Sequence, residues 1–385
     1  MAQTVFVACT EPGPLEQQSI LLFESIRRWT GRFRQAPILS FKPRRSIALD
    51  KSTDAAFSRL EVESRPEILN TEFEHEPFAN KIFAGVWVEE HRSEEIVIFV
   101  DSDSVFTAEP TAAELGPASV AAVRPGSEVG AKLAEAISTR FIGHSPILGD
   151  IVPTSHQIDR QQNYWDSLHT LCGTRVGPTA LTAIDRLPVR GYWNAGLVIV
   201  RREAGIFHRW LENYRTLVRA QHLPRPINQR RVSPRWLSPQ YALSPALAAF
   251  PGKVRVLDGR YNYTLGDRDR LEEPFRSAPL EQLVHVHYFN VFRDPRYLDR
   301  VNPPFPANSE VLGWLRGQRL DRLEPRDSQE LARVKQKLKI AKMRNRKQRQ
   351  KRQHERMRRR ATARALKDAL ADLAKLENSR RRRLG

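Results

Sequence analysis

The sequence predicts an α/β protein with a largely parallel sheet, followed by a strongly basic tail that is helical or disordered. The first forty residues contain a strand, a helix and a second strand, which open a βαβ unit. A buried strand is then expected at 95–100, where an apolar run ends on Asp101 and Asp103. Basic residues gather beyond residue 330. Together these observations predict one α/β domain and a separate tail.

The opening unit begins with a strand expected at 4–9, which ends in the proline- and glycine-rich turn 10–14. Apolar residues at helical spacing predict a helix over 15–29, and a second strand is expected at 36–41. The turn has neither the glycine-rich fingerprint of a dinucleotide site nor that of a P-loop. The sequence therefore argues against both kinds of nucleotide site.

The remaining elements are expected from apolar residues at alternating or helical spacing. The stretch 126–180 shows no such spacing, and irregular insertions of this length are functional loops or disordered segments. The expected elements are a strand at 59–62, helices at 77–92 and 111–115, strands at 118–123 and 191–200, helices at 203–218 and 241–249, and strands at 253–257 and 283–288.

Asp101 and Asp103 follow directly on the strand expected at 95–100. In an open α/β sheet, ligands bind at the carboxyl ends of the strands. Two carboxylates so close together are typical of a divalent cation held by hard oxygen ligands. The alternative, an acidic turn after a strand, stays open at this point.

Two further motifs accompany the D-x-D. Asn194-Ala195-Gly196 lies at the head of a strand, and His287-Tyr288 ends another, close to Arg293. In this order the motifs resemble those of the GT-A glycosyltransferases, most closely the glycogenin-like branch with its late H-Y-x-G-x-x-K-P-W segment. Here Asn290 replaces the glycine of that segment, and Asp294-Pro295 replaces its Pro-Trp.

The resemblance implies a GT-A-like fold over residues 1–325. Such a fold is Rossmann-like, with a mainly parallel central sheet and helices on both faces. Residues 326–385 then form the basic tail. The implied activity is metal-dependent transfer of a sugar from a nucleotide-diphosphate sugar, a UDP-hexose by default, to a glycan, lipid or protein acceptor. Retention at the anomeric carbon is implied by the glycogenin-like branch.

The resemblance also implies roles for individual side chains. A Mn²⁺ or Mg²⁺ ion would bind the two aspartates and the late histidine, next to the diphosphate of the donor. Neutral amides would contact the sugar that is transferred. The expected metal ligands are Asp101, Asp103 and His287; the expected donor-binding residues are Ala8, Thr10, Lys81, Asp101 and Arg293; the expected catalytic residues are Asn194 and Gln240.

Haloacid-dehalogenase-like phosphatases offer a second hypothesis. The segment Asp101-Ser102-Asp103-Ser104-Val105 also fits their hhhh-D-x-D-x-[TV] pattern. Asp101 would then be the nucleophile and Asp103 the acid or base. That pattern normally lies on the first strand, whereas here a βαβ unit and about ninety residues precede it.

The charge distribution sets the tail apart from the rest. Residues 331–385 hold 22 of the 63 basic and 4 of the 44 acidic residues, so their net charge is +18 and the remainder carries +1. No aromatic residue follows Trp314, so the tail is suited to non-specific contact with the phosphates of nucleic acid or an anionic membrane. A third hypothesis is a non-catalytic polyanion-binding protein that acts through this tail.

The compartment is expected to be the cytoplasm, with the tail suited to peripheral binding at the inner face of the membrane. No run of about 18 apolar residues is present, and no basic-flanked leader precedes the first strand. Cys9 and Cys172 have no metal-ligand spacing, and two reduced thiols are expected in such a protein.

Overall fold

The chain divides into two compact units, Met1–Glu324 and Pro325–Gly385. All residues described by the computed structural model lie in the first unit. They are residues 3–46, 48–125, 165–175, 179–182, 188–190, 192–220, 238–289, 291–294 and 296–320. The expected tail, 326–385, lies outside the described residues, and its role remains a prediction.

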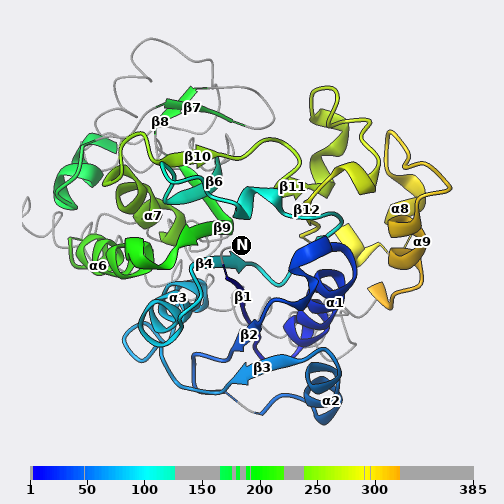
Figure 1. Ribbon diagram of the computed structural model, residues 1–385, viewed down its shortest axis with the longest axis horizontal. Helices are drawn as coiled ribbons and strands as arrows, with labels where there is room; N and C mark the ends of the chain where they lie inside the picture. Colours follow the sequence, from blue (N-terminus) through cyan, green and yellow to red (C-terminus); the bar gives the residue numbers. More distant parts are fainter. Residues whose placement is uncertain are drawn as a thin grey trace, which may run out of the picture. The chain divides into compact units, whose positions relative to one another are not determined.

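Strands and helices alternate along much of the first unit (Figure 1). The strands are β1 (Thr4–Cys9), β2 (Ile38–Phe41), β3 (Val62–Arg65), β4 (Ile96–Val100), β5 (Ser104–Phe106), β6 (Ala121–Pro125), β7 (Thr179–Leu181), β8 (Pro188–Arg190), β9 (Trp193–Arg201), β10 (Val254–Val256), β11 (Tyr263–Thr264) and β12 (His285–His287). The helices are α1 (Pro14–Trp29), α2 (Lys51–Arg59), α3 (Asn80–His91), α6 (Ile206–Arg219), α7 (Ser238–Ala248), α8 (Tyr297–Arg300) and α9 (Glu310–Arg316).

The central sheet has seven strands in the order β10-β6-β9-β4-β1-β2-β3. Among the described strands of this sheet, β9 alone is antiparallel to its neighbours, β4 and β6. The beginning of β9 therefore lies beside the end of β4, with Leu197 opposite Val100. The predicted mainly parallel sheet is confirmed, and its one reversed strand brings the N-A-G motif to the D-x-D.

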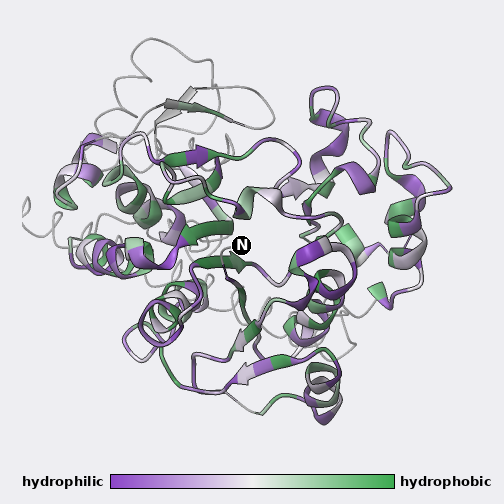
Figure 2. Ribbon diagram, viewed as in Figure 1, coloured by the Kyte–Doolittle hydropathy of each residue, from purple (hydrophilic) through white to green (hydrophobic). Residues whose placement is uncertain are grey.

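Helices cover both faces of this sheet, as predicted. One face packs on α3, α6 and α7, and the other packs on α1 and α2. Figure 1 shows the two groups on opposite sides of the strands. The central strands are hydrophobic along most of their length (Figure 2), because both of their faces are buried. The predicted α/β class, with a mainly parallel central sheet and helices on both faces, is confirmed.

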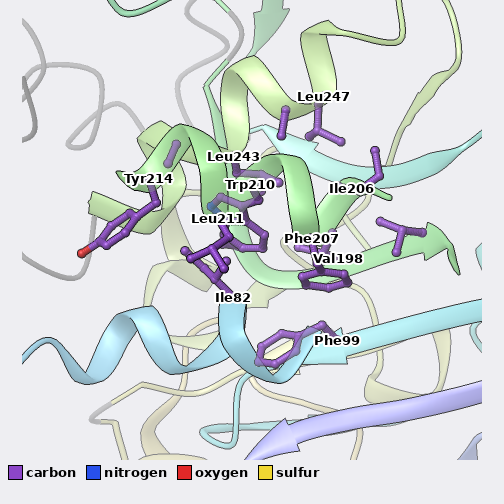
Figure 3. Packing of buried hydrophobic residues seen from close by; sticks show 14 of the residues in the cluster. Ile82, Phe99, Val198, Ile206, Phe207, Trp210, Leu211, Tyr214, Leu243 and Leu247 are labelled. Atoms are coloured by element: carbon purple, nitrogen blue, oxygen red, sulfur yellow. The ribbon is translucent and has the colours of Figure 1, made fainter. Parts of the chain in front are cut away.

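Helix α3 is held close to α6 by a glycine. A Cβ atom at Gly85 would lie 2.0 Å from the ring of Phe207, so a glycine is needed at this crossing. Phe207 and Trp210 pack between the helices and the sheet, near Ile82 and Phe99 (Figure 3). This packing fixes the position of α3, whose first turn carries Lys81.

A second sheet of three strands, in the order β11-β12-β5, adjoins the end of β4. Strand β5 begins at Ser104, directly after the D-x-D, and pairs antiparallel with β12. Strand β11 pairs parallel with β12, with Thr264 opposite His287. A hydrophobic cluster that includes Val286 and residues of α9 lies beside this sheet. The small sheet thus joins the D-x-D to the late histidine segment.

The strand predicted at 59–62 is wrong. Residues 51–59 form α2, and β3 begins only at Val62. Between them Glu61 has a φ of +52°, a left-handed conformation that reverses the chain at the helix end. Arg27 donates hydrogen bonds to the carbonyl oxygens of Leu60 and Glu61 and so stabilises this turn. Four residues of alternation were too few to distinguish a strand from a helix end.

Candidate active site

Three side chains meet where the two sheets join. Asp101 follows β4, Asp103 precedes β5, and His287 ends β12. One ligand atom from each lies within 4.8 Å of the others. We call these residues the Asp–Asp–His cluster. The structure thereby brings together the three side chains that the sequence assigned to a metal.

Asp103 and His287 form a hydrogen-bonded ion pair, with 2.9 Å between Oδ1 and Nε2. Burial alone would raise the pKa of Asp103, but the charge of His287 and this hydrogen bond outweigh burial and lower it. Burial would likewise lower the pKa of His287, and Asp103 instead raises it. The pair therefore favours a carboxylate beside a protonated imidazole when no cation is bound.

Asp101 is held by a lysine from α3. Lys81 Nζ donates to Asp101 Oδ1 at 2.6 Å and to the carbonyl oxygen of Ala195 at 3.2 Å. The side chain of Lys81 is 12% exposed, so its charge acts in a poorly solvated place. The backbone N–H of Asp101 donates to the carbonyl oxygen of Gly196, at 2.9 Å. A cationic amine therefore lies directly beside the acidic residues.

The N-A-G motif packs against this cluster. Asn194 Oδ1 accepts a hydrogen bond from the backbone N–H of Gly196, at 2.7 Å. A Cβ atom at Gly196 would lie 3.0 Å from Oδ1 of Asn194, 3.0 Å from Oδ1 of Asn262, and 3.2 Å from Cε1 of His287. Glycine at this position lets the two amides and the imidazole approach one another closely.

Two expected donor-binding residues, Ala8 in β1 and Thr10 just after it, are buried. Ala8 lies within the strand, and the hydroxyl of Thr10 forms hydrogen bonds of 2.7 Å with the hydroxyls of Ser19 and Ser40. The backbone of Arg293 belongs to the 3-10 helix Val291–Arg293, while its side chain lies outside the described residues. The roles of these three residues remain predictions.

Gln240 lies in the first turn of α7, where its Oε1 accepts a 2.6 Å hydrogen bond from the hydroxyl of Tyr192. The side chain is buried. Its expected catalytic role also remains a prediction.

The sequence did not single out three residues that adjoin the site. Glu11 accepts hydrogen bonds from Nε of Arg44 (2.6 Å) and from the side-chain amide of Asn80 (2.8 Å). Asn80 directly precedes Lys81 in the chain. Asn262 contacts His287, and Phe289 stacks on its ring. Glu11 and Asn262 lie in loops without periodicity, so no pattern marked them. Phe289 occupies the variable position of the H-Y-x-G segment.

Residues 6–250 match the family model of the Rhodobacterales glycosyltransferase domain. The match covers more than half of the 385 residues. The chain belongs to this glycosyltransferase family. Membership in a glycosyltransferase family argues against the other two hypotheses. These were a haloacid-dehalogenase-like phosphatase and a non-catalytic polyanion-binding protein. Among curated proteins, comparison of the sequence finds no significant match.

Several solved glycosyltransferases are similar in structure to this one. The bifunctional glycosyltransferase WbbM is 14% identical with a TM-score of 0.45, over 82% of this chain and 52% of its own. Galactosyltransferase LgtC, solved with donor and acceptor sugar analogues, is 11% identical with a TM-score of 0.40, over 82% and 95%. GlyE of Streptococcus pneumoniae TIGR4 is 13% identical with a TM-score of 0.42, over 84% and 62%. The glycosyltransferase described here thus spans about half the length of WbbM.

The donor atoms of this glycosyltransferase fit a divalent cation. Two carboxylates and one imidazole suit Mn²⁺, which accepts oxygen and nitrogen ligands, and the carboxylates also suit Mg²⁺. Three protein ligands leave coordination positions for phosphate oxygens. In the part of the chain that the structure describes, no helix has the length and apolar character needed to cross a membrane.

Proposed function

We propose that this glycosyltransferase is metal-dependent and uses a nucleoside diphosphate sugar as donor. The observation that carries the proposal is the Asp–Asp–His cluster beside Lys81, at the carboxyl end of β4. Ligands bind at this end of an open α/β sheet. Carboxylates alone would repel a diphosphate, so the cluster suits a diphosphate only when a cation and the lysine offset its charge.

The transfer leaves a nucleoside diphosphate, so negative charge develops on the phosphate oxygen that breaks from the sugar. A cation held by Asp103, Asp101 and His287 would act there as a Lewis acid. Lys81 adds a fixed positive charge at the edge of the same site, where burial strengthens its effect. His287 would hold the cation through Nε2, the nitrogen that faces Asp103, with its ring in the neutral form.

The finer assignments follow from the resemblance to the glycogenin-like branch. A UDP-hexose is the proposed donor, with Ala8, Thr10 and Arg293 on the nucleotide side. Asn194 is proposed to contact the sugar, because its amide lies beside the cluster. Gln240 is proposed for the same role, and retention of anomeric configuration for the reaction. The proposed acceptor is a glycan, or a lipid or protein that carries one.

A thermal-shift screen of nucleoside diphosphates with and without Mn²⁺ tests this function. A ligand that binds the folded protein at 100 times its Kd raises the free energy of unfolding by about 2.7 kcal/mol. UDP with Mn²⁺ should therefore raise the midpoint of thermal unfolding more than either alone. If no nucleoside diphosphate stabilises the protein with Mn²⁺ or Mg²⁺ present, the proposal fails. A covalent phosphoenzyme at Asp101 would revive the phosphatase hypothesis.

We also propose that residues 331–385 localise the enzyme on a polyanionic surface. Their net charge of +18 attracts phosphates within a Debye length of about 8 Å, whereas the rest of the chain carries +1. Deletion of this segment should abolish salt-sensitive binding to heparin and anionic vesicles. Turnover of a small acceptor should be nearly unchanged, because every expected site residue precedes residue 295. A truncated protein that binds heparin as tightly as the full chain would contradict this role.

A further inference from the structure

The ring of His287 is enclosed on several sides. Nε2 faces Asp103 at 2.9 Å, and Nδ1 faces Oδ1 of Asn262 at 3.1 Å. The ring of Phe289 stacks on it, with 3.9 Å between centroids and 19° between planes. The backbone of Gly196 lies close to Cε1. These contacts leave the imidazole one orientation in which Nε2 points toward the aspartates.

Asn262 is itself firmly placed. Its carbonyl oxygen and that of Tyr261 accept hydrogen bonds of 2.6 and 2.7 Å from Nη1 of Arg124. Arg124 is buried in β6 and lies opposite Asn194 in the sheet. Asn262 is 2% exposed and directly precedes β11, the strand that pairs with β12. The large sheet therefore fixes the residue that contacts the histidine of the small sheet.

The backbone of Asn262 favours an asparagine. Its φ is +47°, in the left-handed region that glycine and asparagine adopt more readily than other residues. An aspartate tolerates this region nearly as well. The amide oxygen can only accept a hydrogen bond, so Nδ1 of the histidine must be the protonated nitrogen in a neutral ring. Nε2 then carries the lone pair that a cation needs.

We propose that Asn262 is a positioning residue that fixes the tautomer and orientation of His287 for metal binding. The inference rests on the proposed metal-dependent function. Outer partners of this kind hold metal-bound histidines and usually change metal affinity about 10- to 100-fold when removed. Asn262 contacts neither cation nor donor in this role, and acts only through the imidazole.

Two substitutions at Asn262 distinguish the role of its side chain from the role of its backbone conformation. Asn262→Gly keeps the left-handed turn and removes the hydrogen-bond acceptor. Asn262→Asp keeps an acceptor oxygen at the same reach. Mn²⁺ titrations of the full chain, followed by electron paramagnetic resonance with and without UDP, give the affinity. Electron spin echo modulation from ¹⁴N reports whether an imidazole coordinates the bound Mn²⁺, a readout that general destabilisation would not move.

We expect Asn262→Gly to weaken Mn²⁺ binding about 10-fold or more and to reduce the ¹⁴N modulation. Asn262→Asp should retain both the Mn²⁺ affinity and the ¹⁴N modulation. His287→Ala should lose the ¹⁴N modulation. Unchanged affinity and unchanged modulation in Asn262→Gly would overturn the positioning role alone. Bound Mn²⁺ without ¹⁴N modulation in the unsubstituted protein would overturn it together with the ligand role of His287. No Mn²⁺ binding at all, even with UDP, would overturn the proposed function as well.

Discussion

The two sheets that meet at the site differ in how their positions are determined. The seven-stranded sheet is buried between two layers of helices, and β4 lies between β1 and β9. In the three-stranded sheet, β12 has three residues and β11 only two. The first sheet supplies the carboxylates as a direct extension of β4. The second supplies the histidine, whose position depends on pairing with β5 and on Asn262.

The two halves of the site are therefore expected to respond differently to substitution. The family match ends at residue 250, so it includes the D-x-D and the N-A-G strand but neither Asn262 nor His287. Large hydrophobic layers hold the strand that carries the carboxylates, whereas the imidazole depends on short strands, two hydrogen-bond partners and the stacked ring of Phe289. We therefore expect metal binding to be sensitive to changes in the small sheet, and stability to be sensitive to changes around the large one.

The largest effect is expected where both sheets contribute, at Asp103. Asp103→Asn removes a metal ligand and the charge partner of His287, and should lower turnover at least about 100-fold, since metal catalysis supplies several kcal/mol. The Asp103 side chain is 30% exposed, so the fold should persist. Turnover and Mn²⁺ affinity are measured together with thermal unfolding.

Asp258→Asn, on the surface beside Arg260, is the matched control and should leave turnover and Mn²⁺ affinity nearly unchanged. Full turnover in Asp103→Asn would contradict the assignment.

Gly85→Ala tests the large sheet and its helices. The added Cβ would meet the ring of Phe207 at 2.0 Å, so the substitution should destabilise the protein by about 1–3 kcal/mol through overpacking. Mn²⁺ affinity should change little in the folded protein. Denaturant unfolding measures the loss. Adding Phe207→Leu makes space, so the double variant should lose less than the sum of the single losses. Additive losses would argue against a clash between these residues.

Gly196→Ala tests the contact between the sheets. Its Cβ would come within 3.0–3.2 Å of Asn194, Asn262 and His287, which must then shift by a few tenths of an ångström. We expect Mn²⁺ affinity to fall about tenfold, the lower end of the effect of disturbing a partner of a metal ligand. Gly313→Ala is the matched control, since its Cβ would meet nothing within 4 Å. Equal affinity in the two variants would show that the contact has no role in metal binding.

The smallest effect concerns pH and the first turn of α6. Burial alone would lower the pKa of His208, but its hydrogen bonds with Glu89 and Glu90 outweigh burial and raise it. The stabilisation is fully present below the ordinary histidine pKa of 6.5 and is lost as the pH rises through the raised value. His208→Gln should therefore lose stability mainly at low pH, by less than about 1 kcal/mol because the side chain is 46% exposed. Thermal unfolding from pH 5 to 9 measures it, and a pH-independent loss would contradict the ionic origin.

The sequence predicted most strands and helices of the large sheet, but it gave their ends only approximately. The strand expected at 118–123 is β6, Ala121–Pro125, and the helix expected over 77–92 begins as a 3-10 turn before α3. The ends of strands and helices depend on hydrogen bonds to other parts of the chain. An example is the bond from the backbone N–H of Val120 to the carbonyl oxygen of Lys253. A periodic pattern does not contain this information.

In the candidate site, too, some residues were predicted from the sequence and some contacts appear only in the tertiary structure. The two aspartates were found because they follow an apolar run, and the resemblance to the glycosyltransferases then added His287 at the end of a later strand. The ion pair of Lys81 with Asp101 joins residues 20 positions apart, and Asn262 lies 25 positions before His287. Both contacts exist only because a helix and a short strand are packed beside the end of β4. Glu11 and Arg44 were missed for the same reason.

By itself the sequence determined the α/β class, the buried strand that delivers the D-x-D, the N-A-G strand and the basic tail, because these depend on local periodicity, burial and charge. Only the tertiary structure decided that β9 runs against its neighbours and that β12 pairs with β5. Pairing between distant segments depends on the total surface that they bury together. The cluster that could hold a cation was therefore completed by long-range packing.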